Sequence, residues 1–202
     1  MKNDVILEKF RVIKTFNSEE YYNRELLIYK LNLPYIPDML EYNSNPESEK
    51  QWIILHRLYG HNPQPGSLDD FQKALYTLIR FHRDLKNLNL SFSHNDPNPK
   101  NFIIEDDKCY LFDFSDISQR EAGYDILAFF LFTVDFLNED CLKQLIEFYT
   151  SHFSFDYRIC LALYDKSILE FDQRRAFYKN INTLTKTQLD KRELIRKMMI
   201  NK

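Results

Sequence analysis

Residues 93–116, S-H-N-D-P-N-P-K-N-F-I-I-E-D-D-K-C-Y-L-F-D-F-S-D, decide the fold that we expect of this chain. They contain an acid, Asp96, an amide five positions later, Asn101, and a second acid, Asp113. Two short apolar runs around a polar turn separate Asn101 from Asp113, which predicts a β-hairpin over residues 102–112. Such a hairpin returns Asp113 to the neighbourhood of Asn101, so three oxygen-bearing side chains converge.

The chemistry of these three side chains suits phosphoryl transfer. Asn101 and Asp113 offer the hard oxygen ligands that Mg2+ prefers. Asp96 is then left to accept a proton from the hydroxyl group of a substrate. Because proteins that transfer phosphoryl groups mainly position the reactants and neutralise charge, this small set of residues is sufficient.

Two motifs resemble a known family. The H-x-D-x-x-x-x-N pattern of residues 94–101, followed by D-F-S at 113–115, is similar to the catalytic and metal-binding loops of the kinase-like fold. The H-N-D form of the first motif, together with Y-D-I-L-A at 124–128, resembles the aminoglycoside phosphotransferase and choline kinase branch of that fold.

The resemblance implies roles for individual residues. Asp96 and His94 would be catalytic, Asn101 and Asp113 would bind Mg2+, and the carboxylate of Asp125 would brace the catalytic loop. It also implies an α+β, two-lobed protein-kinase-like fold. Its parts would be a small, truncated, β-rich N-lobe over residues 1–58 and a larger, mainly α-helical C-lobe over residues 59–202.

The nucleotide-binding residues are expected in the N-lobe. Residues 4–16 are strand-like, as one long strand or a tight pair, and contain Lys14 in the sequence V-I-K. The resemblance implies that Lys14 contacts the phosphates of ATP and that Glu25 pairs with it. Glu25 lies in a helix predicted over residues 17–33, with Asn17 as its cap. Lys9 is the alternative lysine.

Two further strands are predicted, over residues 36–42 and 51–58, on either side of a polar turn. By resemblance, the second strand leads into the hinge between the lobes. Leu55, Arg57 and Leu58 would bind the adenine there.

A second kinase-like motif, H-R-D-L-K-N-L-N at residues 82–89, is excluded by its spacing. Asn101 precedes Asp113 by twelve positions, which leaves room for one hairpin, whereas Asn89 precedes it by twenty-four. Apolar residues at helical spacing instead place this segment at the end of a helix that Ser67 caps.

The start of the chain departs from the family pattern. Only thirteen residues precede Lys14, and none is glycine, whereas a kinase N-lobe normally carries a glycine-rich loop over the phosphates. Either that cover is absent, or residues 1–10 supply a shorter one. A binding or scaffolding module without catalysis therefore remains an alternative. A protein kinase is a further alternative, disfavoured because no A-P-E-like segment follows Asp113.

If the protein is an enzyme, we expect transfer of the γ-phosphate of ATP to a hydroxyl group of an amino-alcohol, an aminoglycoside or a sugar-like molecule. The acceptor would bind between the catalytic loop and the C-terminal helices. Asp116, Glu121 and nearby aromatic rings would suit a cationic acceptor there. Arg174 and Arg175 are interpreted as part of a charged, solvent-exposed face.

Composition excludes several other classes. The net charge of -3 gives no basic footprint for nucleic acid. The three cysteines are isolated, which indicates neither a disulfide framework nor a zinc site. No apolar run approaches the length of a membrane span, and no signal peptide is evident, so the expected location is the cytoplasm. The oligomeric state is not predicted.

Overall fold

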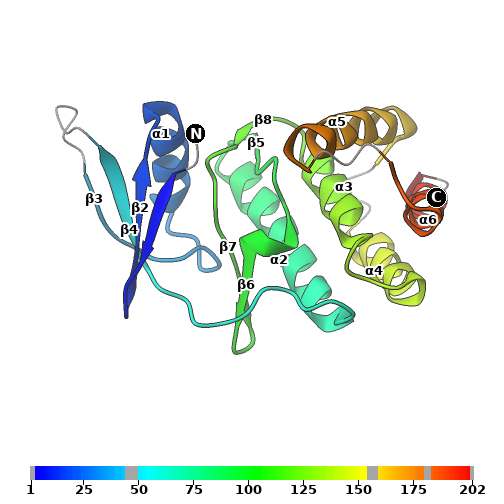
Figure 1. Cartoon of the computed structure of the whole chain (residues 1–202), viewed down its shortest axis with the longest axis horizontal. Coiled ribbons are helices and arrows are strands. Elements are labelled where there is room, and N and C mark those ends of the chain that lie inside the picture. The colour runs from blue at the N-terminus through cyan, green and yellow to red at the C-terminus, as the bar shows by residue number, and fades with distance from the viewer. Residues whose placement is uncertain (1–2, 44–49, 154–158, 180–182, 201–202) are drawn as a thin grey trace.

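The computed structural model describes residues 3–43, 50–153, 159–179 and 183–200. Its N-terminal part is an antiparallel sheet of four strands in the order β1-β2-β4-β3, accompanied by helix α1 (Figure 1). These elements span Asp4–Leu7 (β1), Arg11–Phe16 (β2), Glu19–Tyr29 (α1), Met39–Tyr42 (β3) and Gln51–His56 (β4).

Of the two arrangements expected for residues 4–16, the structure contains the tight pair. Strands β1 and β2 form a hairpin whose register runs from Asp4 opposite Thr15 to Leu7 opposite Val12. The hairpin has no glycine, and β1 is the exposed edge of the sheet.

Helix α1 is shorter than predicted at both ends. Its N-cap is Ser18 rather than Asn17, and the side chain of Ser18 makes no capping hydrogen bond. The helix ends at Tyr29 instead of Leu33 because Asn32 has a φ of 50°, a left-handed conformation that interrupts a right-handed helix. The polar turn predicted after β3 lies largely in residues 44–49, outside the described ranges.

The C-terminal part is mainly helical, with small two-stranded sheets between its helices. The predicted hairpin is confirmed as β6 and β7, whose register pairs Phe102 with Leu111. The loop predicted over residues 118–123 contains a short strand, β8, because β5 pairs with it. The elements are α2 (Leu68–Asn87), β5 (Phe92–Ser93), η1 (Pro99–Asn101), β6 (Phe102–Glu105), β7 (Lys108–Leu111), β8 (Ser118–Gln119), α3 (Ala122–Thr133), α4 (Glu139–His152), α5 (Leu161–Lys179) and α6 (Lys186–Ile200).

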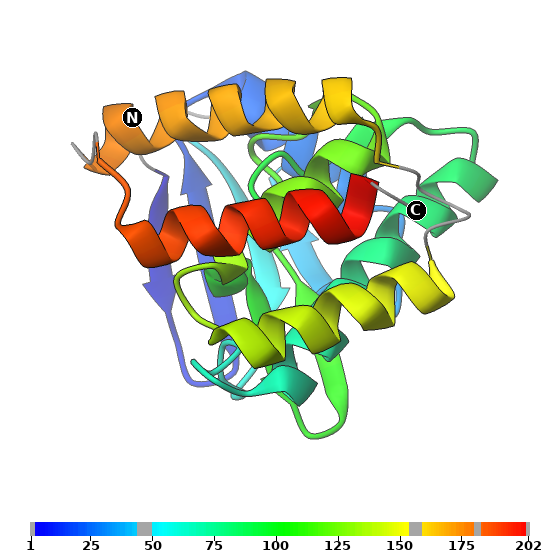
Figure 2. The ribbon, with the colours of Figure 1, turned by 90° about the vertical axis from the view of Figure 1, so that its right-hand side faces the viewer.

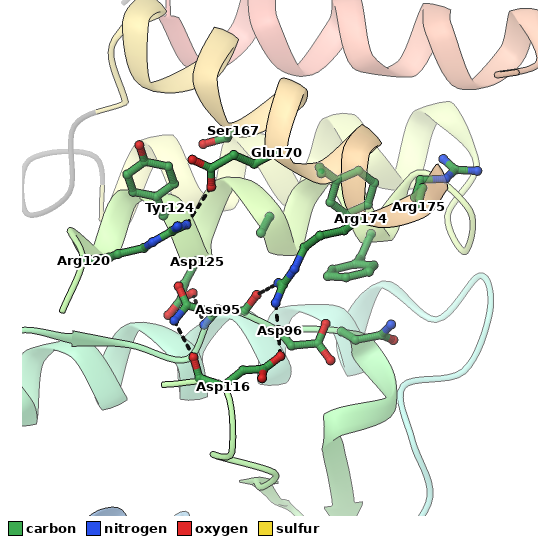
Figure 3. Close-up of a pocket in the computed structure, with 14 residues that line it drawn as sticks. Asn95, Asp96, Asp116, Arg120, Tyr124, Asp125, Ser167, Glu170, Arg174 and Arg175 are labelled. Carbon is green, nitrogen blue, oxygen red and sulfur yellow. Dashed lines mark hydrogen bonds and ion pairs between the residues drawn. The ribbon is translucent and has the colours of Figure 1, made fainter. Parts of the chain in front are cut away.

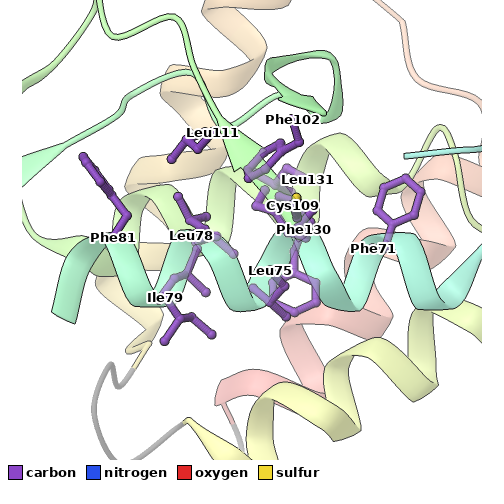
Figure 4. Close-up of a cluster of buried hydrophobic side chains, with 14 of the residues drawn as sticks. Phe71, Leu75, Leu78, Ile79, Phe81, Phe102, Cys109, Leu111, Phe130 and Leu131 are labelled. Carbon is purple, nitrogen blue, oxygen red and sulfur yellow. The ribbon is translucent and has the colours of Figure 1, made fainter. Parts of the chain in front are cut away.

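Helix α2 is the central support of this part. The hydroxyl of Ser67 accepts a hydrogen bond from the backbone N–H of Asp70, which confirms the predicted cap. The buried face of α2 packs between the β6–β7 hairpin and the surrounding helices (Figure 4). His82 lies within α2 and is buried, so the excluded H-R-D motif is part of a helix.

The last three helices form the outer face of the molecule. Helix α6 lies between α5 and α4 (Figure 2). Helix α5 also packs along α3, next to the loops that follow β5 and β7. Within the described ranges, no helix combines the length and apolar character needed to cross a membrane.

Gly60 brings the linker after β4 against the β6–β7 hairpin. His61 and Ile104 exchange two backbone hydrogen bonds, of 2.9 and 2.7 Å. A Cβ atom on Gly60 would lie 1.8 Å from the carbonyl oxygen of Ile104. This close approach of two backbones requires glycine.

We predict that Gly60→Ala destabilises the protein by about 2 kcal/mol, because the backbone of Ile104 cannot move aside without losing the bridge to His61. Gly123→Ala is the matched control, since its Cβ would meet only the flexible end of Leu163. Urea unfolding of both variants tests this, and equal losses of stability would contradict it.

Candidate active site

Lys14 joins the N-terminal sheet to the end of the β6–β7 hairpin. Its ammonium group donates to Glu25 Oε1 on α1 and to Asp113 Oδ1, 2.6 Å away. Lys14 and Glu25 are both buried, at 9% and 0% exposed. The lysine and the glutamate expected to pair therefore do so. The alternative lysine, Lys9, lies instead over the ring of Phe10 in the β1–β2 turn.

Burial and neighbouring charges shift the pKa values of Lys14 and Glu25 in opposite directions. Burial by itself would lower the pKa of Lys14, but the carboxylates of Glu25 and Asp113 outweigh it and raise the pKa. Burial raises the pKa of Glu25 to about 7, although Lys14 opposes the shift. Only one of the two carboxylate oxygens of Glu25 meets Lys14, and the other, Oε2, is buried without a hydrogen-bond partner.

Asp113 retains an oxygen for a metal ion. Its Oδ1 accepts from Lys14 and from the hydroxyl of Ser115 at 3.0 Å, so Oδ2 is used by neither contact. Burial would raise the pKa of Asp113, but Lys14, His94 and Ser115 together bring it below its usual value. Asp113 is therefore ionised at neutral pH.

Asn101 is oriented by the loop that carries Asp96. Its amide nitrogen donates to the backbone oxygen of Asp96 at 2.8 Å and to Asp96 Oδ2 at 3.1 Å. The amide oxygen of Asn101 takes no part in these two contacts and is a hard ligand. The oxygen donors of Asn101 and Asp113 thus fit Mg2+, which usually takes one or two protein ligands and completes its shell with phosphate and water.

Asp96 is half-buried at the edge of a cavity. Burial raises its pKa, while His94, Arg174 and Asn101 partly offset the increase. A carboxylate with a raised pKa is a stronger base than an exposed aspartate and can accept a proton from a hydroxyl group.

His94 supports residues 94–101, the loop expected to be catalytic and called the catalytic loop below. It is fully buried, its Nε2 lies 2.9 Å from the backbone oxygen of Phe112, and its Nδ1 accepts from the N–H of Asp96 at 3.4 Å. These contacts assign the tautomer protonated at Nε2. They give His94 a positioning role, because its ring does not line the cavity beside Asp96.

Asp125 braces the same loop, as expected. Its carboxylate accepts from the backbone N–H groups of His94 and Asn95, at 2.5 and 2.8 Å, and lies 2.9 Å from His82 Nε2. Burial would raise the pKa of Asp125, but His82 and His94 reverse the shift and lower it. Asp125 is only 1% exposed, so its carboxylate is a buried structural support for this loop.

Two residues of the site have left-handed backbones. Asn95 has a φ of 64° and Asp113 a φ of 65°. Side chains other than glycine rarely adopt this conformation, and Asn and Asp tolerate it best. The side-chain amide of Asn95 donates to the backbone oxygen of Asp116 and the hydroxyl of Ser118, at 2.7 and 2.8 Å. These bonds hold the loops after β5 and β7 together.

Phe114 connects the parts of the site through aromatic contacts. It is fully buried, with its ring centroid 5.5 Å from Tyr29 on α1, 5.7 Å from Phe81 on α2 and 5.1 Å from His94. The residue after Asp113 therefore packs against α1, α2 and the catalytic loop at once.

The three residues expected to bind adenine differ in whether their backbone groups are available to a ligand. Leu55 is buried within β4, opposite Val12. The backbone N–H of Arg57 donates to Phe10, which leaves that group engaged. Leu58 lies two residues after the end of β4 and has no backbone hydrogen bond to another described residue, so its groups can contact a ligand.

A cavity of about 350 Å3 opens beside Asp96, between the catalytic loop and α5. Figure 3 shows Arg120 and Glu170 at one end, Arg175 at the other, and Arg174 reaching between them toward Asn95 and Asp116. Arg174 donates to the backbone oxygen of Asn95 and to Asp116 Oδ2, 3.1 Å away.

The face of α5 toward this cavity was missed in the sequence. Ser167, Glu170, Phe171, Arg174 and Arg175 line it, at the i, i+3, i+4, i+7 and i+8 spacing of one helical face. The interpretation of Arg174 and Arg175 as solvent-exposed was wrong for Arg175, which is 9% exposed. The i, i+3, i+4 pattern was the available signal, but it mixes polar and apolar residues.

Asp116 and Glu121, the two acids expected to bind a cationic acceptor, are not both available in the cavity. Asp116 lines the cavity, but its carboxylate is already paired with Arg174. Glu121 is exposed at the start of α3 and does not line the cavity. Over the described ranges, no group of three or more His, Cys, Asp or Glu side chains is arranged to hold a metal ion.

Comparisons with known proteins show the fold. No protein-family model matches the chain, and no curated protein matches it. Among solved structures, the chain is similar to WbdD in a 2.2 Å crystal structure, with a TM-score of 0.53 and 16% identity over 98% of this chain and 48% of that one. A medium-resolution structure of "the bifunctional kinase-methyltransferase WbdD" gives 0.52 and 15% over 98% and 47%.

A third match is the co-crystal structure of WbdD and the kinase inhibitor LY294002, with a TM-score of 0.51 and 16% identity over 95% of this chain and 48% of that one. The chain thus spans about half the length of these solved chains. Together with the small antiparallel sheet and the larger helical part, these matches show a truncated, two-lobed kinase-like fold.

We predict that Glu25→Gln flattens the pH dependence of stability. Because the folded-state pKa of about 7 exceeds the usual 4.5, the stability that Glu25 contributes is fully present below pH 4.5 and lost as the pH rises through 7. The free energy of unfolding of the natural protein, relative to the variant, should fall by about 3 kcal/mol over that range.

Urea unfolding at pH 4.5, 6 and 7.5 measures this difference. Glu19→Gln, which removes an exposed acid from the same helix, serves as the control and should leave the slope unchanged. A constant difference between the natural protein and Glu25→Gln would contradict the assignment.

Proposed function

We propose that this protein is an ATP- and Mg2+-dependent phosphotransferase that transfers the γ-phosphate to a hydroxyl group of a small molecule in the cytoplasm. The observation that carries the proposal is the contact of Lys14 with Asp113, 99 positions apart in the sequence, with Glu25 behind the lysine. A second contact supports the proposal, because Asn101, just before the β6–β7 hairpin, donates to Asp96. An ion pair with only a structural purpose would not need this second contact.

Each residue has a distinct task in this proposal. Lys14, held by Glu25, would bind phosphate oxygens in place of its present contact with Asp113. Asn101 and Asp113 would hold Mg2+, which when bound neutralises charge on the transferred group. Asp96 would orient the acceptor hydroxyl and accept its proton. Adenine would bind beside Leu58, at the end of β4.

The solved structures support a kinase-like reaction. One of them is described as a bifunctional kinase-methyltransferase and another contains a kinase inhibitor, and both have the fold of this chain. The substrates of those proteins do not carry over at 15–16% identity.

One observation favours a second candidate, a binding module that lacks catalysis. The β1–β2 hairpin contains no glycine, and the exposed β1 is the outermost strand beside Lys14. Backbone amides of a glycine-rich loop normally grip the phosphates, so their loss would weaken nucleotide binding.

We predict that ATP binds the purified protein only weakly without Mg2+ and at least about tenfold more tightly with it, since Asp113 and the phosphates otherwise repel each other. Isothermal titration calorimetry with and without Mg2+ measures the difference, and Asp113→Asn should abolish it. Failure to bind at millimolar ATP in either condition would favour the binding module.

We predict that Asp96→Asn lowers turnover at least about 100-fold while leaving the Kd for Mg2+-ATP unchanged, because Asp96 acts on the acceptor. ADP release in the presence of sugars, amino-alcohols and aminoglycosides measures turnover, and calorimetry measures binding. Asp84→Asn, an acid of the excluded H-R-D motif on α2, is the control. Unchanged turnover in Asp96→Asn would remove Asp96 from the proposed mechanism.

A further inference from the structure

The cavity beside Asp96 has few negative charges available for a ligand. Glu170 is paired with Arg120 at 2.7 Å, and Asp116 with Arg174 at 3.1 Å. Asp125, which also lines the cavity, is committed to the catalytic loop. Apart from the base itself, the acids of this cavity are therefore neutralised. A cationic acceptor would have to displace an arginine to gain a partner.

Arg175, in contrast, is a positive charge of this cavity that has no acidic partner in the described part of the chain. It lines the same cavity and is 9% exposed, yet among the described residues no hydrogen bond or ion pair to it is found. Its Nε atom is buried without a partner. An arginine that lines a cavity without a counter-charge, and whose Nε is buried without a partner, is available to bind an anion there.

Ser167 provides a second unsatisfied group on the same helix face. It is 5% exposed, and its Oγ has no hydrogen-bond partner. A serine hydroxyl can both donate and accept, as the hydroxyl groups of a sugar do. Tyr124, Phe132 and Phe171 add aromatic surface to the wall of the cavity.

The cavity also continues beyond the Arg174–Asp116 pair. A second cavity of about 590 Å3 shares this pair with the first and extends to Gln173 and Phe177 on α5. The cavity and this open groove together leave room for a molecule larger than a small amino-alcohol, such as a sugar.

We propose, given the phosphotransferase function above, that the acceptor is a polyhydroxylated, sugar-like molecule carrying a carboxylate or phosphate ester, and that Arg175 binds this anionic group. The acceptor hydroxyl then lies at Asp96, the sugar ring lies between Ser167 and the aromatic side chains, and the anion lies at the Arg175 end of the cavity. Arg175 is accordingly a specificity-determining residue.

The test measures binding without nucleotide, so it does not depend on catalysis. The probes are D-glucuronate and D-glucose 6-phosphate as anions, D-glucose as the neutral reference, and D-glucosamine and choline as cations. Titrations of the full chain followed by saturation-transfer NMR detect millimolar affinities. We expect at least one anion to bind at least about tenfold more tightly than D-glucose. The comparison of the two anions tells a carboxylate from a phosphate ester.

Variants connect the preference to one side chain. Arg175→Gln should remove the advantage of the anion over D-glucose, and Arg175→Lys should retain part of it. Arg196→Gln, which removes an exposed arginine paired with Glu193 on α6, should leave the preference intact. The Tm of Arg175→Gln should equal or exceed that of the natural protein, since the variant loses a charge that is paired with no described residue.

Three results would overturn the proposal: cations that bind as tightly as anions, anions that bind no better than D-glucose, or an anion preference that survives in Arg175→Gln. The two proposals fail separately. Transfer of phosphate to choline or D-glucosamine with equal efficiency would sustain the phosphotransferase and reject the anionic acceptor. Anion binding through Arg175 without ADP release would sustain the anion site and reject the phosphotransferase.

Discussion

The site depends on one buried carboxylate. Asp125 is 1% exposed, and an ionised group at that depth is unfavourable unless donors surround it. The backbone N–H groups of His94 and Asn95 donate to Asp125, and the ring of His82 lies 2.9 Å away. The loop after β5 must therefore keep one conformation, and the conformation that satisfies Asp125 also directs Asp96 into the cavity. Helix α2 contributes through His82, so the core and the catalytic loop are coupled through a single side chain.

A second group of charges connects the two lobes. Lys14 comes from the sheet, Glu25 from α1 and Asp113 from the end of the β6–β7 hairpin. Beside them, Phe114 packs on Tyr29 and Phe81, so the polar contact has an apolar support immediately next to it. The orientation of the sheet over the helical part follows from these contacts and from the close backbone approach at Gly60.

Short-range patterns predicted much of this arrangement. The β6–β7 hairpin, the Ser67 cap and the positions of Asp96 and Asn101 on one loop follow from spacing and turn chemistry, which act over a few residues. The pairing of Lys14 with Glu25 came from family resemblance and could not be derived from periodicity, because lysines are common in strands. The left-handed turn at Asn32 overrode a helical pattern that continued to Leu33.

The face of α5 could not be found in the same way. Its residues mix a serine, a phenylalanine and charged side chains, so no hydropathy pattern distinguishes them from a surface face. These residues line the cavity because α5 lies against the loop after β5, more than 70 positions earlier in the sequence. Arg174 contacts that loop at Asn95. Contacts over such a distance depend on the packing of α5 on α3, which local sequence does not specify.

The left-handed backbone of Asp113 has a practical consequence for mutagenesis. Its φ of 65° suits aspartate, asparagine and glycine but disfavours alanine by about 1 kcal/mol or more. An alanine scan would therefore mix the loss of a carboxylate with a distortion of the turn that carries it. Asparagine removes only the charge, and glycine removes the side chain without straining the turn. The pair of substitutions separates chemistry from conformation at a position where both select the same amino acid.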